Sequence, residues 1–236
     1  MKNFPVGFIA LGALVLSACG QVPDVTPSST AAAPAPFQVT LLSPAQQNAL
    51  RHQLQELRDV QAQVAAGTLT APVDDAGQVV DLGALIQSFE LDLQMGAQPL
   101  NIEVPSGKLN PQAAPYAQYI YTNIAGDNNF RGNYSFNKSR FPRFNWSNDG
   151  CSGPSEYTGW SDEFYWPCLA HDFGYRNARL YPNLLNGNHR AWVDSQFKQH
   201  MRLKCDTLGW RKYPCYAAAE GFYQAVRLRG AGSFYP

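Results

Sequence analysis

Four cysteines within residues 151–215 limit the folds that this chain can adopt. Cys151, Cys168, Cys205 and Cys215 lie among segments with a helical apolar pattern. In an oxidising compartment, four cysteines can form two disulfides, and three pairings are open. The local pairing closes the shortest loops. We therefore expect a small, mainly α domain with disulfide bonds.

Apolar spacing predicts three helices in this domain, at about 164–180, 187–205 and 215–229. The segment "NNFRGNYSFNKSRFPRFNWSNDG", which ends at residue 150, is rich in turn-forming residues. The compact domain as a whole is predicted to span residues 116–236.

In the preceding region, residues 37–115, the sequence predicts one clear helix. The secondary structure of the other residues remains undecided. That helix covers about 44–66, where Ser43 and Gln46 have the form of a capping box. Residues 78–93 fit a short strand and an amphipathic helix equally well. The region contains no group of chemically reactive side chains, so its role is open: a spacer, a propeptide or a partner surface.

The N-terminus has the features of an export signal. Residues 1–18 predict a signal peptide, because the apolar run at 6–16 is too short for a bilayer span of about 20 residues. The ending "LSAC" resembles a bacterial lipobox and predicts a lipid on Cys19; the alternative is ordinary cleavage nearby. Residues 19–36 indicate a flexible tether. We expect an exported chain, lipid-anchored to the bacterial cell envelope, or secreted if Cys19 carries no lipid.

The charge balance argues against one class of partner. Lys and Arg total 18, and Asp and Glu also total 18, so the formal net charge is zero. A nucleic-acid-binding protein usually shows a basic excess. We therefore expect no nucleic-acid partner.

The stretch "PCLAHDFGYRN" places a histidine and an aspartate next to each other in a predicted helix. Adjacent helical side chains diverge by about 100 degrees, so His171 and Asp172 cannot serve one face. Cys168, His171 and Tyr175 share a face. This spacing favours a base that faces a cleft and an acid that serves another centre.

A second aspartate lies on the apolar face of the next predicted helix. Asp194 shares this face with Phe197 and Met201. A buried lone carboxylate is costly, so Asp194 needs a partner. His171 is the candidate, because a hydrogen bond from one ring nitrogen would leave the other nitrogen free to act as a base.

A metal site is predicted beside this pair. If Cys151 pairs with Cys168, the turn "SNDGCSG" is held close to Asp172. Asp149, the loop carbonyls and Asp172 then offer oxygen ligands. Such a set suits calcium better than zinc.

These motifs resemble a known family. "WSNDGC" (146–151), "CLAHDFGYRN" (168–177), "VDSQF" (193–197) and the closing cysteine pair are similar to the prokaryotic and fungal type of secreted phospholipase A2. The resemblance covers about residues 116–230. The glycine-rich calcium loop of the animal enzymes is absent.

The resemblance implies a role for each matching residue. His171 would be the general base and Asp194 its orienting partner. Calcium would be held by Asp172, Asp149 and the carbonyl of Gly150. The implied disulfides are the local ones, Cys151–Cys168 and Cys205–Cys215. The implied reaction is hydrolysis of the sn-2 ester of a glycerophospholipid at a membrane or micelle surface, by a monomer.

Two other functions remain open from the residues alone. One is a non-catalytic, calcium-dependent lipid-binding module, which would not need the histidine–aspartate pair. The other is a metal phosphohydrolase of the HD type, for which His189 and His200 are the spare histidines. We expect both of these, and His52, to be exposed. A group of aromatic residues fits a core and a membrane-facing rim equally: Trp160, Phe164, Tyr165 and Trp166.

Overall fold

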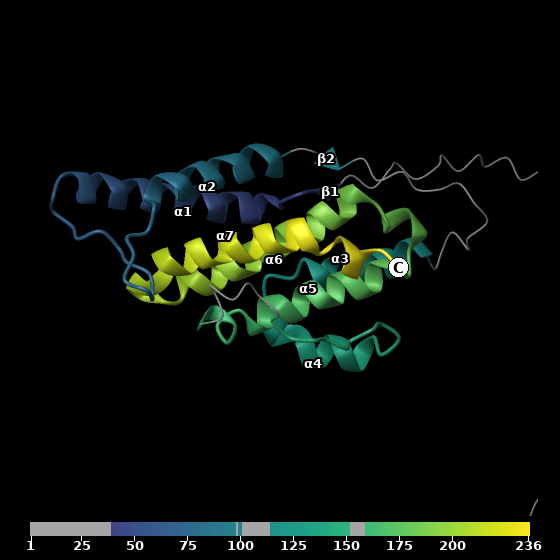
Figure 1. Cartoon of the computed structure of the whole chain (residues 1–236). Coiled ribbons are helices and arrows are strands. Elements are labelled where there is room, and N and C mark those ends of the chain that lie inside the picture. The colour runs from purple at the N-terminus through teal and green to yellow at the C-terminus, as the bar shows by residue number, and fades with distance from the viewer. Residues whose placement is uncertain (1–38, 98, 101–113, 152–158) are drawn as a thin grey trace, which may run out of the picture. The chain divides into compact units, whose positions relative to one another are not determined.

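Three long helices form the frame of the C-terminal half: α5 (Tyr165–Ala178), α6 (Gly187–Asp206) and α7 (Lys212–Arg229). Helix α6 packs against both α5 and α7 (Figure 1). The three predicted helices are confirmed. Helix α7 begins earlier than expected because Pro214 lies in its first turn, where no backbone N–H is needed.

The computed structural model describes residues 39–97, 99–100, 114–151 and 159–236. The predicted signal peptide, Cys19 and the tether lie outside these residues. The described residues lie within one compact unit. No helix among the described residues is long and apolar enough to cross a membrane.

The N-terminal region contains two helices, α1 (Pro44–Ala65) and α2 (Leu82–Gly96). The predicted capping box starts α1: Ser43 Oγ accepts from the Gln46 N–H, and the Gln46 side chain accepts from the Ser43 N–H. The undecided segment is helical because Asp81 caps α2 and an apolar stripe follows at helical spacing: Leu82, Leu85, Ile86 and Phe89. Two short strands flank these helices as an antiparallel pair, β1 (Val39–Thr40) and β2 (Pro99–Leu100).

Two further helices, α3 (Ala114–Ala125) and α4 (Phe130–Arg140), precede α5. Helix α4 lies in the segment that the sequence showed to be rich in turn-forming residues. Although Asn and Gly are poor helix formers, Lys138 and Arg140 in the last turn favour the helix dipole, and Phe130 is buried. The remaining elements are short: η2 (Pro182–Leu184), η3 (Gly209–Arg211) and α8 (Ala231–Phe234).

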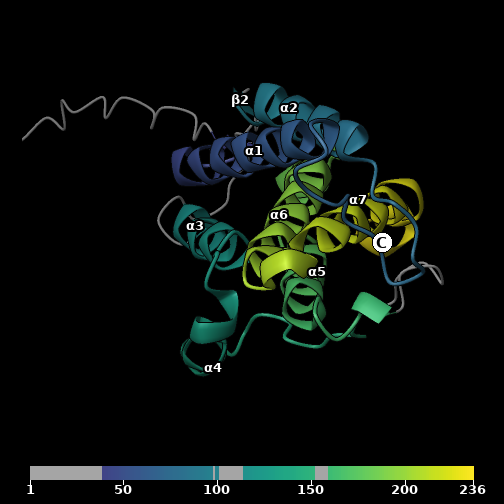
Figure 2. The same ribbon diagram turned by 90° about the vertical axis from the view of Figure 1, so that its left-hand side faces the viewer.

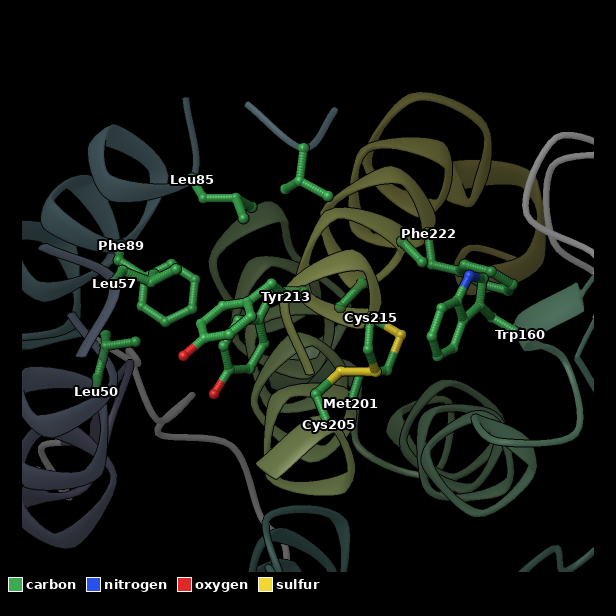
Figure 3. Close-up of a cluster of buried hydrophobic side chains, with 14 of the residues drawn as sticks. Leu50, Leu57, Leu85, Phe89, Trp160, Met201, Cys205, Tyr213, Cys215 and Phe222 are labelled. Atoms are coloured by element: carbon green, nitrogen blue, oxygen red, sulfur yellow. A yellow bond between two sulfur atoms is a disulfide. The ribbon is translucent and has the colours of Figure 1, made fainter. Parts of the chain in front are cut away.

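One apolar core joins the N-terminal helices to the C-terminal frame. Leu50 and Leu57 of α1 and Phe89 of α2 are in the same buried cluster as Met201 of α6 and Phe222 of α7 (Figure 3). Figure 2 shows α1 and α2 beside α6 and α7, with α5 on the other side of α6. Each fully buried side chain of this size contributes about 1.5–3 kcal/mol. The N-terminal helices are therefore part of the body that carries α6.

Buried polar contacts strengthen the same junction. Gln46 Nε2 donates to Gln196 Oε1 at 2.7 Å. On the other face of α6, Lys198 and Arg202 lie 2.8 and 2.7 Å from the Asp92 carboxylate of α2. Both cations are almost fully buried, and removing one partner of such a pair is strongly destabilising. This network fixes the position of α2 on α6.

Substitutions in α2 test whether this packing is real. Phe89 is 0 % exposed, lies edge-on to Tyr216 and packs under the Arg202 guanidinium. We expect Phe89→Ala to lower the free energy of unfolding by about 3–5 kcal/mol. The control, Leu91→Ala, removes a side chain of the same helix that is 54 % exposed, and should cost under about 1 kcal/mol. Urea denaturation measures both, and equal losses would contradict the shared core.

The two disulfides join Cys151 to Cys168 and Cys205 to Cys215, the local pairing that the resemblance implied. The first attaches the loop after α4 to the first turns of α5. The second closes the turn between α6 and α7. Both therefore hold segments around the same helices.

Candidate functional site

The predicted contact between His171 and Asp194 is present. His171 lies on α5 and Asp194 on α6, and His171 Nε2 is 2.9 Å from Asp194 Oδ1. The Asp194 side chain is 0 % exposed, and that of His171 is 10 % exposed. Because a carboxylate can only accept, the Nε2 atom carries the proton. In the neutral ring, the Nδ1 atom is then the nitrogen that can accept a proton.

A small residue lets the two helices come close enough for this contact. Gly174 faces Val193, and a Cβ built on Gly174 would lie 2.6 Å from Val193 Cγ1. Any larger residue would push α5 away from α6. The glycine of "HDFGYRN" therefore sets the distance between the His171 and Asp194 backbones.

Asp194 has three hydrogen-bond donors. Besides His171, the Tyr175 hydroxyl donates to Oδ1 at 2.6 Å, and Arg227 Nη1 donates to Oδ2 at 2.7 Å. Burial acts to raise the pKa of Asp194, but these three hydrogen bonds outweigh it and hold the pKa below its usual value. The carboxylate therefore stays ionised inside the protein, where it can stabilise a positive charge on His171.

Arg227 and Tyr175 were not predicted as partners of Asp194. Tyr175 follows His171 by one helical turn, so its place on the same face was visible in the sequence. Arg227 lies on α7, 33 residues after Asp194. No local pattern connects two such positions, and only the packing of α6 against α7 brings them together.

His171 opens onto a cavity of about 420 Å³. One part of its wall is apolar and comes from α5, α6 and α7, with Cys168, Phe197, Phe222, Ala225 and Val226. The rest is polar and includes the loop residues Asp149 and Gly150. No described residue is recorded as hydrogen-bonded to His171 Nδ1. A cavity of this size accommodates an organic ligand next to the basic nitrogen.

The loop before Cys151 is held against α5 beside Asp172. The Asp149 N–H donates to Asp172 Oδ2 at 3.0 Å, and the Asn145 N–H donates to Asn177 Oδ1 at 2.7 Å. The prediction that His171 and Asp172 point in different directions is confirmed. His171 bonds to Asp194, while Asp172 accepts a hydrogen bond from the loop. The two neighbouring residues therefore belong to different centres.

The donor set around Asp172 fits a hard cation. Burial and the neighbouring Asp149 carboxylate raise the pKa of Asp172 to about 7. Two carboxylates so close together are best balanced by positive charge, and here Arg176 Nη2 lies 2.7 Å from Asp149 Oδ1. Gly150 lines the same cavity with a φ of +76°, which only glycine adopts easily. Among the described residues, no group of three or more His, Cys, Asp and Glu side chains gathers to hold a metal, so a cation here would also need backbone oxygens.

The expectation that His189 and His200 are exposed is wrong. Both are buried in α6, and burial lowers the pKa of each, to about 3 and about 4. His189 Nε2 lies 2.8 Å from the Tyr121 hydroxyl, so this ring belongs to the core. His200 has no hydrogen-bond partner among the described residues. His52 is exposed, as predicted.

The four aromatic residues just before and at the start of α5 divide into two groups. Trp160 and Phe164 are buried in the core that α7 shares. Tyr165 is exposed, and the half-buried Trp166 packs edge-on to Tyr134 of α4. Trp160 and Phe164 are therefore core residues, while Tyr165 and Trp166 lie at the surface.

The fold and the site together define a disulfide-bonded helical domain with a histidine–aspartate pair beside a cavity that also presents two carboxylates. Residues 120–230 match the family model of prokaryotic phospholipase A2. This segment of the chain is therefore similar to the phospholipase A2 family.

A curated relative agrees with this assignment. A secretory phospholipase A2 of Arthroderma benhamiae is 32 % identical over 96 residues, which are 39 % of this chain and 63 % of the relative. The chain thus spans under two thirds of that protein. No solved structure gives a significant match. The match to the family model begins at residue 120 and does not include the two N-terminal helices.

Proposed function

We propose that this chain is a calcium-dependent phospholipase A2 that hydrolyses the sn-2 ester of glycerophospholipids to a lysophospholipid and a fatty acid. The observation that carries the proposal is the His171–Asp194 pair, because His171 also lines a cavity whose wall is partly apolar. A general base and an acyl-sized apolar cavity are the two requirements of ester hydrolysis of a lipid.

In the proposed mechanism His171 Nδ1 removes a proton from water, and this water attacks the ester carbonyl directly. The proton goes to the imidazole and later to the leaving alkoxide. The ionised Asp194 stabilises the imidazolium and keeps the ring oriented, with Tyr175 and Arg227 holding the carboxylate in place. No side chain of the pair is a nucleophile, so no acyl-enzyme forms.

Asp172, Asp149 and the carbonyl of Gly150 would hold the calcium ion. When bound, calcium would supply positive charge for the substrate phosphate and for the developing oxyanion. The all-oxygen donor set supports this choice. Arg176 would then have to share Asp149 with the ion, because its guanidinium now lies 2.7 Å from that carboxylate.

The same proposal includes export. The relative is named a secretory enzyme, and the two disulfides are typical of an oxidising compartment. Cleavage before Cys19 and its lipidation would anchor the mature chain to the envelope. Mass spectrometry of the mature N-terminal peptide tests this, and an unmodified Cys19 would contradict the anchor.

Product analysis on phospholipid vesicles tests the activity. With calcium we expect equimolar lysophospholipid and fatty acid, and with a chelator we expect neither. Magnesium at the same concentration is the matched control and should not replace calcium. Vesicle binding that needs calcium but yields no product would favour the non-catalytic lipid-binding module.

A further inference from the structure

The cavity changes character along its length. Cys168 of α5 lies near one end of the cavity, and Arg179, which caps the C-terminus of α5, lies near the other. Eleven residues of helix span about 16 Å. Helix α7 runs in the same sense, because Phe222 lies edge-on to Phe164 and Gly230 packs against Tyr175. One end is therefore apolar, the other polar, and His171 lies between them.

Three arginines line the polar end: Arg176, Arg179 and Arg229. Arg176 is paired with the Asp149 carboxylate. Arg179 donates to the backbone carbonyls of Ser233 at 2.5 Å and Phe234 at 3.4 Å, and no carboxylate of the described residues forms an ion pair with it.

Arg229 has no recorded ion pair or hydrogen bond with any described residue, and its side chain is exposed. Among the described residues, the carboxylates that line the cavity are Asp149 and Asp172. The three described arginines exceed these two acids by one positive charge, and a bound divalent cation would increase the excess. Arg179 and Arg229 are thus the guanidinium groups available to a ligand.

We infer that this end of the cavity selects phospholipids whose headgroup is anionic, such as phosphatidylglycerol, over those with a choline headgroup. The inference rests on the proposed function and refines its substrate. A glycerol headgroup leaves the phosphate charge unbalanced and offers hydroxyls to the guanidinium groups. Choline brings a cation, which Arg179 and Arg229 would repel. The sites that bind quaternary ammonium groups use aromatic faces, and the described lining here offers Tyr175 alone near the arginines.

The test must separate headgroup recognition from attraction to a charged membrane, because a basic surface binds anionic vesicles in any case. Short-chain phosphatidylglycerol and phosphatidylcholine below their critical micelle concentrations meet this need. We expect wild type to show a kcat/KM for phosphatidylglycerol about tenfold above that for phosphatidylcholine, at fixed calcium and ionic strength.

Arg229→Gln should reduce this ratio severalfold, mainly through KM for phosphatidylglycerol. Arg229→Lys should keep most of the ratio, because it keeps the charge. Arg51→Gln is the control, since Arg51 lies on the exposed face of α1 and contacts only neighbours on its own helix. An equal kcat/KM for the two lipids in wild type, or an unchanged ratio in Arg229→Gln, would overturn the inference and leave the proposed function intact.

A binding measurement keeps the two proposals distinguishable. Calorimetry with the non-hydrolysable diether analogues of the same two lipids compares the headgroups without turnover. Preference for the glycerol headgroup without hydrolysis of either ester lipid would contradict the proposed function and support the inference. Equal affinity for the two analogues would contradict the inference.

Discussion

His171→Ala is expected to lower kcat by about 10³-fold, because general-base catalysis contributes effects of this order. Calcium affinity should stay close to that of wild type, since His171 bonds to Asp194 and not to Asp172. Folding should survive because both disulfides and the α5–α6 contact at Gly174 remain. Stopped-flow or pH-stat assays on purified protein measure the rate, and circular dichroism confirms the fold.

Two controls make this result specific. His52→Ala removes an exposed histidine of α1 and should leave kcat unchanged. Tyr175→Phe removes one of the hydrogen bonds to Asp194 and should reduce kcat far less than loss of the base, while Asp194→Asn should reduce it strongly. Near-normal turnover in His171→Ala would remove His171 from the mechanism.

Asp172→Asn is expected to weaken calcium binding while leaving the His171–Asp194 pair in place, the reverse of the effect of His171→Ala. The substitution removes one of two carboxylates from the proposed calcium site, so calcium affinity should fall at least about tenfold and activity should fall with it. His171 and Asp194 are untouched, so activity should recover in part at high calcium. Calorimetric titration of Asp172→Asn and His171→Ala gives the two affinities side by side.

The matched control is Asp59→Asn, which removes an exposed carboxylate of α1 that bonds only to Gln55. It should change neither calcium affinity nor rate. Asp149→Ala should resemble Asp172→Asn in a milder form, because Asp149 is 70 % exposed and already shares its charge with Arg176. Calcium binding by Asp172→Asn at wild-type affinity would show that the HD pair does not include a metal ligand.

Much of the fold was predictable because apolar spacing and cysteine position are local signals. The pattern located α5, α6 and α7, and the capping residues located the start of α1. Helix α4 was missed because its stability comes from the burial of Phe130 and from its charged last turn, while its composition is that of a loop. The pattern of α2 was ambiguous because its apolar stripe is stabilised by contacts with distant residues, such as those of Phe89 with Tyr216 and Arg202.

Some residues of the site could also be predicted from local sequence signals, and others could not. Asp194 was predictable because a carboxylate on an apolar face requires a partner, and His171 was the titratable group within reach. Arg227 and the buried Lys198–Asp92 pair were not, because both are set by contacts between distant helices. His189 and His200 were expected at the surface from polarity alone, which fails where a long helix is covered on several faces.

The most direct test of the account is the position of the bond that is cut. A phosphatidylglycerol with different acyl chains at sn-1 and sn-2 is incubated with the purified chain and calcium, and the products are identified by mass spectrometry. The account predicts release of the sn-2 acid alone, leaving the lysolipid that carries the sn-1 chain. Release of the sn-1 acid, or of a phosphorylated headgroup, would contradict it.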